Sequence, residues 1–213
     1  MHVFLITVYQ FRWPVRLNCA VNQQKRRFFI ALLPPQPIQD YANEIKQYFA
    51  EHYASHAAQK SPPHITLQAP FEWSMDEIDT LKQSLSEFAI AQIPIPISLS
   101  GFSAFVPRVI YINVLRTPAL LDLHQALITH METALGIVDP KVKQRPFAPH
   151  MTVAFRDLTK QNFRAAWPEF QHRSLEFEFL ASHLTLLLHN GQRWNSYEDF
   201  PLASSISTPL RTD

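Results

Sequence analysis

Residues 61–71 read SPPHITLQAPF, and residues 147–155, FAPHMTVAF, repeat the central pattern of that stretch. In both copies a proline precedes a histidine, which is followed by an aliphatic residue, a threonine and a second aliphatic residue. Because the side chains of a β-strand alternate between its two faces, the histidine and the threonine of each copy should share one face. The pattern therefore predicts two strands that each present an imidazole beside a hydroxyl.

The periodicity of apolar residues around the two motifs predicts the same order of elements twice: strand, helix, motif strand, helix, strand. In the first half of the chain these elements are expected at residues 28–33, 37–52, 64–68, 74–88 and 95–101. In the second half they are expected at residues 108–114, 120–135, 150–155, 160–170 and 174–181. The repeat predicts two equivalent lobes, and the prolines of the segment 95–101 indicate an edge strand.

A third His-x-Thr occurs at His183-Leu184-Thr185. It has no preceding proline, it follows a predicted strand with no helix between them, and it lies beyond the second repeat. We interpret it as part of an ordinary strand, with His183 and His189 at an edge or on the surface.

The composition is that of an ordinary globular protein of 213 residues, with 46% hydrophobic and 17% charged residues. Its 19 basic and 18 acidic residues give a formal net charge of +1, which excludes a broad cationic surface for long nucleic acid. A nucleic-acid substrate should therefore be short or held locally. The three glycines, Gly101, Gly136 and Gly191, lie far apart, which excludes a Walker loop and a dinucleotide fingerprint.

The termini are expected to lie outside the folded unit. The apolar run near the start of residues 1–24 is too short to span a bilayer and lacks the basic region of a secretory signal, so an extension is expected, with an extra strand or a surface anchor as alternatives. Residues 204–213 are expected to be a flexible tail. The folded unit is then a single domain of residues 25–203, with lobes of about 25–103 and 104–203.

A lone cysteine, Cys19, gives no reason to expect an oxidising compartment, so a cytoplasmic protein is expected.

If the two lobes face each other, His64 and His150 line one cleft. Imidazole has an unperturbed pKa near 6.5, so one ring can accept a proton near neutral pH while the other donates one. The hydroxyls of Thr66 and Thr152 can donate hydrogen bonds to the nonbridging oxygens of a phosphodiester. This chemistry requires no metal.

The paired HITL and HMTV strands, with RFFIALLPP opening the first lobe, resemble the two-histidine (2H) phosphoesterase superfamily in its 2′-5′ RNA ligase-like and cyclic phosphodiesterase branch. The resemblance runs from about Arg27 to Asn190. It implies a bilobal α+β fold in which mostly antiparallel sheets flank a central cleft. It also implies a hydrolase without metal or other cofactor, acting on an RNA end or a small cyclic nucleotide. We expect a monomer without membrane contact.

The resemblance makes His64 and His150 the acid and base pair and Thr66 and Thr152 the phosphate-binding hydroxyls. Relatives often carry a basic residue five places after the second histidine, whereas Arg156 stands six places after it. In a regular strand Arg156 would still lie on the site face, so it is a candidate for phosphate binding, with a surface arginine as the alternative.

Three further residues are candidates for substrate binding. Arg145 could guard the cleft or belong to a loop, Tyr111 could stack on a base or pack in the core, and Gln68 could contact substrate or only provide polarity at a strand edge. Phe71 and Trp73 follow the first motif and could form an aromatic wall or pack over the next helix.

The remaining histidines are expected to lie outside the site. His52 and His56 are four residues apart, a spacing that can chelate metal, but no further ligands accompany them, so no metal site is expected. His124 and His130 do not share a helical face and are expected on the surface.

The sequence thus predicts a metal-independent phosphodiesterase that opens a 2′,3′-cyclic phosphate by attack of water. By resemblance, protonation of a leaving 3′-oxygen would give a 2′-phosphate. The alternatives are 2′-5′ ligation, trimming of RNA ends, or an RNA- or nucleotide-binding module without turnover.

Overall fold

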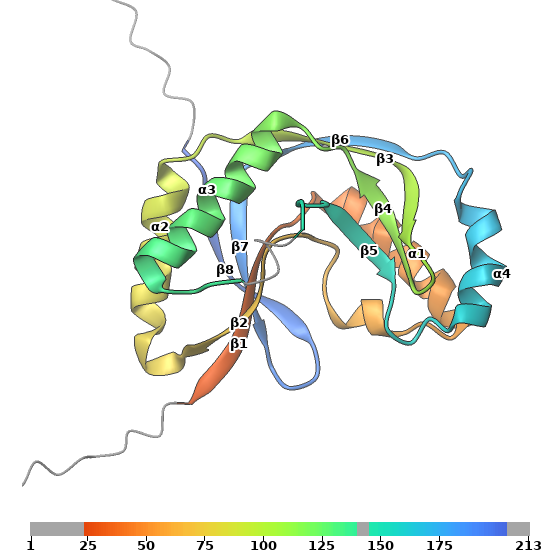
Figure 1. Ribbon diagram of the computed structural model, residues 1–213, viewed down its shortest axis with the longest axis horizontal. Coiled ribbons are helices and arrows are strands. Elements are labelled where there is room, and N and C mark those ends of the chain that lie inside the picture. The colour runs from red at the N-terminus through yellow and green to blue at the C-terminus, as the bar shows by residue number, and fades with distance from the viewer. Residues whose placement is uncertain (1–23, 140–144, 204–213) are drawn as a thin grey trace, which may run out of the picture.

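The computed structural model describes residues 24–139 and 145–203, which form two four-stranded sheets with four α-helices on them (Figure 1). The strands are β1 (Lys25–Leu32), β2 (Ile65–Ser74), β3 (Ile95–Phe105), β4 (Val109–Val114), β5 (His150–Ala154), β6 (Glu176–Ala181), β7 (His183–His189) and β8 (Trp194–Pro201). The α-helices are α1 (Gln36–Tyr53), α2 (Ile78–Ile90), α3 (Pro118–Leu135) and α4 (Lys160–Phe170), and the 3₁₀ helices are η1 (Ala57–Lys60) and η2 (Met75–Glu77).

All neighbouring strands in both sheets are antiparallel. The first sheet has the order β2-β1-β7-β8 and the second has the order β5-β4-β3-β6. This confirms the predicted α+β class with antiparallel sheets.

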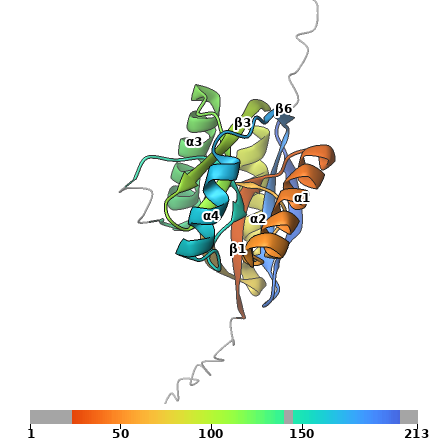
Figure 2. The same ribbon diagram turned by 90° about the vertical axis from the view of Figure 1, so that its right-hand side faces the viewer.

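The two halves of the chain exchange elements, so the predicted division into lobes at about residue 103 differs from the observed sheets. The strand β3 of the first half pairs with β4 and β6, whereas β7 and β8 of the second half complete the sheet that contains β1. Helix α1 likewise packs on β5 and α4, and α3 packs on β2 and α2 (Figures 1 and 2). The apolar run of β7 explains part of this exchange, because a strand buried on both faces requires an interior position in a sheet.

Both motif strands lie at the edge of their own sheet, and these two edges approach each other near the middle of the molecule (Figure 1). The strand β2 begins the first sheet and β5 begins the second. The topology therefore brings the two histidine motifs to a common place although they are far apart in sequence.

One cluster of buried apolar side chains contains residues from both sheets and all four α-helices. Helix α1 contributes Ile38, Ala42, Ile45 and Phe49, whose spacing follows the helical period, and the ring of Phe49 lies 4.6 Å from that of Phe170 in α4. This packing fixes α1, and with it the segment that leads into the first motif.

Most predicted elements coincide closely with the observed ones. Helix α3 ends at Gly136, whose φ of +67° is the left-handed conformation that favours glycine. Ser74 caps η2, since its Oγ accepts a hydrogen bond from the Asp76 amide at 3.3 Å. The His183-Leu184-Thr185 stretch lies in β7, as predicted. The polar edge strand β8 is a feature that the periodicity did not predict.

The prediction that residues 95–101 form an edge strand needs a correction. The strand β3 is interior in the sheet order, but residues 95–100 pair with β6, and pairing with β4 begins only at Leu99. Pro96 therefore lies where the strand has a neighbour on one side only, so its missing amide donor interrupts no ladder.

The extension was expected at residues 1–24 and the tail at residues 204–213, and apart from Gln24 both lie outside the described residues. In the described parts of the chain, no helix is both long enough and apolar enough to span a membrane.

Candidate functional site

The two motif histidines have the same local geometry. Each stands at the start of its strand, with His64 directly before β2 and His150 as the first residue of β5. The Nδ1 of His64 lies 2.7 Å from the Pro62 carbonyl oxygen, and the Nδ1 of His150 lies 2.8 Å from that of Ala148. A carbonyl oxygen can only accept, so both Nδ1 atoms carry the proton of the neutral ring and donate it. Each Nε2 is then left as the atom with a free lone pair.

Aromatic side chains of neighbouring strands pack against both imidazoles. The ring of Phe29 lies 4.8 Å from that of His64, and the rings of Phe105 and Tyr111 lie 5.0 Å and 5.2 Å from that of His150. Tyr111 is only 8% exposed. Of its two predicted roles, the structure shows packing: Tyr111 supports His150 and is not among the residues that line the adjacent pocket.

Burial makes both imidazoles weak bases. It lowers the pKa of His64 to about 4, an effect to which the nearby charges of Lys46 and His150 add, and it also lowers the pKa of His150. The hydrogen bonds to the Pro62 and Ala148 carbonyls oppose this shift. Near neutral pH both rings are therefore neutral in the free protein, and protonation of His150 would disfavour protonation of His64.

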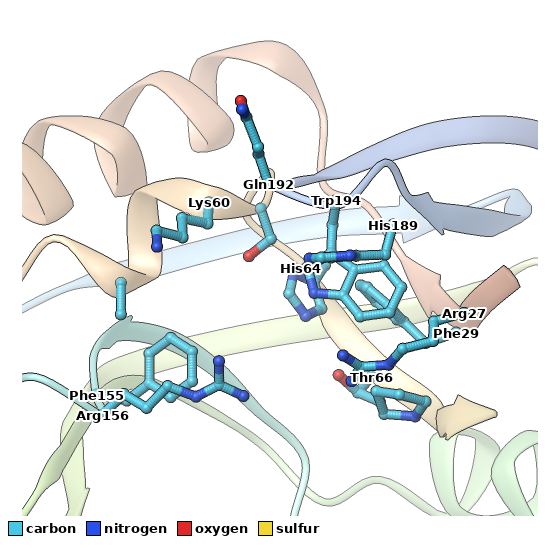
Figure 3. Close-up of a pocket in the computed structure, with 13 residues that line it drawn as sticks. Arg27, Phe29, Lys60, His64, Thr66, Phe155, Arg156, His189, Gln192 and Trp194 are labelled. Carbon is cyan, nitrogen blue, oxygen red and sulfur yellow. The ribbon is translucent and has the colours of Figure 1, made fainter. Parts of the chain in front are cut away.

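A pocket of about 170 Å³ lies beside His64 (Figure 3). Of the residues predicted for the site, the pocket is lined by His64, Thr66 and Arg156. His150 and Thr152 are not among its lining residues; they lie on the facing edge strand β5. The remaining lining residues are Arg27, Phe29, Ala57, Lys60, Ser61, Pro70, Phe155, His189, Gln192 and Trp194.

Arg156 reaches the pocket from a turn and not from a regular strand. The strand β5 ends at Ala154, the φ of Arg156 is +64°, and the Asp157 amide donates to the Phe155 carbonyl at 2.8 Å. The expectation that strand alternation would place Arg156 on the site face is thus corrected, because the left-handed residue ends the strand and the turn directs its side chain.

Asp157 joins this turn to the segment before the first motif. One of its oxygens accepts a hydrogen bond from the Ser55 Oγ at 3.0 Å, and the other accepts from the amides of His56 and Ala57 at 2.8 Å and 2.9 Å. The latter two amides are at the N-terminus of η1, whose last residue, Lys60, lines the pocket. The Asp157 carboxylate therefore fixes the positions of two pocket walls relative to each other.

His189 was expected at an edge or on the surface, but it is partly buried and lines the pocket. Its ring lies 4.8 Å from that of Trp194, which in turn lies 4.7 Å from that of Phe29. The hairpin of β7 and β8 thus supplies a wall of the pocket. No local pattern signals this, because the contact depends on β7 pairing with β1.

Lys46 of α1 was not predicted for the site. It is 2% exposed, and its Nζ donates a hydrogen bond to the Ser61 carbonyl at 2.9 Å. Burial lowers its pKa to about 7. Within the described part of the chain no carboxylate pairs with it. Its one partner belongs to the segment that leads into His64.

The other candidates lie outside the His64 pocket. Gln68 is 2% exposed, its Oε1 has no hydrogen-bond partner among the described residues, and it lines a separate pocket together with Arg27 and Phe71. Arg145 is exposed and is not among the residues that line the His64 pocket. The Trp73 Nε1 donates a hydrogen bond to the Glu77 carbonyl at 2.8 Å, and this bond fastens the end of β2 to η2. Of the two predicted alternatives for Trp73, this agrees with packing over the next helix.

Two helix histidines were expected on the surface, and this expectation was wrong. His124 is 5% exposed and stacks on Phe147 with ring centres 3.7 Å apart, and His130 is partly buried with its Nε2 2.8 Å from the Ser84 Oγ. Among the described residues, no group of three or more histidine, cysteine or acidic side chains is placed to hold a metal.

Comparison with known proteins identifies the family. The family model described as the 2′-5′ RNA ligase superfamily matches residues 34–193. A relative from Geobacillus kaustophilus is 33% identical over 82% of this chain and 95% of its own length, and one from Bacillus licheniformis is 31% identical over 84% and 99%. Both carry the name "Putative phosphoesterase".

Solved structures share the fold. TT0787 of Thermus thermophilus matches with a TM-score of 0.59 and 19% identity, covering 84% of this chain and 99% of that one. Escherichia coli LigT in complex with 3′-AMP matches with a TM-score of 0.58 and 20% identity, covering 85% of this chain and 100% of that one. The chain belongs to the 2′-5′ RNA ligase superfamily, the family of two-histidine phosphoesterases.

Proposed function

We propose that this protein is a metal-independent phosphodiesterase that hydrolyses the 2′,3′-cyclic phosphate of an RNA end or a nucleotide, with His64 and His150 as the general acid and base. The observation that carries the proposal is the matched geometry of the two rings. Each donates its Nδ1 proton to a backbone carbonyl and keeps Nε2 free, on edge strands that approach each other. Such a pair supplies both proton transfers of the reaction.

In the proposed step, a water oxygen attacks phosphorus while the bond between phosphorus and the 3′-oxygen breaks. One neutral imidazole accepts a proton from the water, and the other ring, as imidazolium, donates its proton to the leaving 3′-oxygen. The product is a 2′-phosphate with a free 3′-hydroxyl. Which histidine has which role decides which oxygen leaves, so the isomer formed identifies the direction of opening.

The lowered pKa values suit a general base, whereas a general acid must hold a proton near neutral pH. Binding of an anionic substrate can favour that protonated form. Both rings are neutral near pH 7 in the free protein. A bound phosphate anion favours the charged form of a nearby imidazole, so binding raises the pKa of the ring that is to act as acid. We therefore expect proton uptake to accompany binding of an anionic substrate.

The groups around the rings suit a phosphodiester anion. The hydroxyls of Thr66 and Thr152 lie one alternation along the strand from their histidines and can donate to nonbridging oxygens. Arg156 adds a permanent positive charge to the pocket. E. coli LigT, a protein of similar fold, has been crystallised with 3′-AMP, a nucleotide monophosphate, which agrees with a nucleotide substrate.

The first prediction tests both rings. In buffer containing EDTA, the protein should hydrolyse adenosine 2′,3′-cyclic phosphate, and His64→Ala and His150→Ala should each lower kcat/KM at least about a hundredfold, the usual contribution of a general acid or base. The matched control is His183→Ala, which removes the exposed histidine of the third His-x-Thr and should leave the rate unchanged. Wild-type turnover in either motif variant would refute the assignment.

The alternatives are separated by substrate and by product. Joining of a 2′,3′-cyclic phosphate end to a 5′-hydroxyl end would show ligation, which uses the same two proton transfers with a hydroxyl in place of water. Tight binding of adenosine 2′-phosphate without hydrolysis between pH 5 and pH 8 would show a binding module.

A further inference from the structure

The pocket beside His64 carries more positive charge than a cyclic phosphate needs. Arg27, Lys60 and Arg156 line it, and none of the acidic side chains in residues 24–139 and 145–203 does. Across the whole chain, 19 basic and 18 acidic residues nearly cancel, so the excess is local. A cyclic phosphodiester has a single negative charge, which Arg156 and the two threonine hydroxyls can already meet. The remaining cations indicate a substrate with a second anionic group.

The cations in the pocket are available to a ligand. The one ion pair found among the described residues lies elsewhere on the molecule. The guanidinium of Arg27 lies over the ring of Trp194, 5.4 Å from its centre, and that of Arg156 lies at the same distance from the centre of the Phe155 ring. Contact with an aromatic face holds a guanidinium in place without neutralising its charge.

His189 has the tautomer opposite to that of the two motif histidines. Its Nδ1 accepts a hydrogen bond from the Gly191 amide at 3.2 Å, so the proton of the neutral ring is on Nε2. The ring is therefore a hydrogen-bond donor and not a base when it is neutral. A donor of this kind suits an anion, whereas the free Nε2 lone pairs of His64 and His150 suit proton transfer.

Three cations act on His189 at once. Burial lowers its pKa, and the charges of Arg27, Arg156 and Lys60 lower it further. In Figure 3, Arg27, His189 and Trp194 lie together on the side of His64 and Thr66, whereas Lys60 and Arg156 lie across the pocket from them. The permanent positive charge thus lies on both sides of the pocket, with Arg27 on the side of His64 and Lys60 and Arg156 on the other.

We propose that Arg27 and His189 form a subsite for a second phosphate, and that the substrate class is a cyclic phosphate whose ribose also carries a phosphate on its 5′-oxygen. The inference rests on the proposed function. Once O2′ and O3′ are joined in the cyclic phosphate, O5′ is the one ribose hydroxyl left for esterification. The same position is occupied by the terminal phosphate of a 5′-phosphorylated nucleotide and by the internucleotide phosphate of an RNA end.

A binding experiment tests the subsite independently of turnover. Calorimetry at low ionic strength and pH 7 compares adenosine 2′-phosphate with adenosine 2′,5′-bisphosphate. The bisphosphate should bind the wild type at least about tenfold more tightly, as expected for one or more charge-assisted hydrogen bonds. Arg27→Ala and His189→Ala should each lower this ratio to about two or less. The matched control, Arg164→Ala, removes an exposed charge of α4 outside the pocket and should keep the wild-type ratio.

Equal affinities of the wild type for the two nucleotides would overturn the subsite, and so would an unchanged ratio in both Arg27→Ala and His189→Ala. The two proposals fail separately. Hydrolysis of cyclic phosphates without a 5′-phosphate preference would leave the proposed function and remove the subsite, whereas the affinity ratio without hydrolysis would leave the subsite and remove the function. Comparing kcat/KM for 5′-phosphorylated adenosine 2′,3′-cyclic phosphate with that for cyclic-ended ApA distinguishes a terminal from an internucleotide phosphate.

Discussion

At the scale of the residue, the hydrogen-bond partner of Nδ1 decides what each histidine of the site can do. His64 and His150 donate to carbonyl oxygens, which leaves their Nε2 atoms as acceptors, whereas His189 accepts from an amide, which leaves its Nε2 as a donor. Three imidazoles of the same intrinsic basicity thus present two different groups at Nε2, an acceptor in His64 and His150 and a donor in His189.

The buried side chain of Lys46 is expected to lower the stability of the fold. A lysine that is buried without a carboxylate partner is disfavoured in its charged form, which the fall of its pKa from 10.5 to about 7 reflects. Its hydrogen bond to the Ser61 carbonyl orders the segment that precedes His64. We expect Lys46 to be a positioning residue whose benefit to activity outweighs this loss of stability.

The prediction for Lys46 concerns stability and its dependence on pH. Between pH 7 and pH 10.5 the unfolded chain holds the lysine proton and the folded chain has lost it, so raising the pH stabilises the fold. From pH 7 to pH 9 the free energy of unfolding of the wild type should therefore rise by about 2–3 kcal/mol relative to Lys46→Met, at 1.36 kcal/mol for each pH unit. Urea denaturation of both proteins at the two pH values measures this.

The Met variant should also have a lower kcat/KM, since the Ser61 carbonyl loses its donor. A constant stability difference between the two proteins across this pH range would show that Lys46 remains charged in the fold.

At the scale of the element, the turn that follows β5 connects the two sides of the site. It places Arg156 in the pocket with a left-handed φ, and its next residue, Asp157, caps η1 through the amides of His56 and Ala57. One short segment therefore determines both the position of the pocket arginine and that of the opposite wall.

Replacing the Asp157 carboxylate should affect stability and substrate binding together. In Asp157→Asn the side chain keeps its size, but the negative charge that accepts hydrogen bonds from the His56 and Ala57 amides is lost, and one oxygen acceptor becomes an NH2 donor. Because the residue is exposed, the expected loss of stability is about 1.5 kcal/mol, at the low end for hydrogen bonds to a charged group. KM for a cyclic nucleotide should rise, because the turn that holds Arg156 loosens.

Thermal denaturation and steady-state kinetics measure both effects. Asp122→Asn, an exposed position on α3, is the matched control. If Asp157→Asn has the same stability and KM as the control, the Asp157 carboxylate does not hold the Arg156 turn against η1.

At the scale of the whole molecule, the site exists because the two halves of the chain exchange strands. β7 and β8 pair beyond β1 and leave β2 as an edge, and β3 and β6 pair beyond β4 and leave β5 as an edge. If the strands of each half had paired only with one another, the sheet order would not have left β2 and β5 as edges that approach each other.

The sequence contained enough information for the local features of the site. Strand alternation placed His64 and Thr66, and His150 and Thr152, on common faces, and the periodicity placed a helical segment at residues 74–88, where the structure has η2 and α2. These features depend on neighbours along the chain, and for that reason a single sequence was sufficient.

The remaining features depend on which elements become neighbours in space. Arg27, Lys46 and His189 belong to three elements whose contact follows from the strand order, and nothing in their own sequence surroundings specifies that order. Arg156 was expected from alternation but is placed by a turn, and His124 was expected on the surface but is covered by Phe147. His124 is buried by a tertiary contact, whereas Arg156 is placed by a local turn that the alternation of a regular strand does not signal.

The central claim is that both imidazoles act on one phosphate, and an NMR titration of histidine-labelled protein with adenosine 2′-phosphate tests it most directly. The resonances of His64 and His150 should shift together with the same dissociation constant, and the pKa of at least one ring should rise in the complex, because the anion favours the imidazolium. A titration in which only one of the two rings responds to the nucleotide would contradict the account.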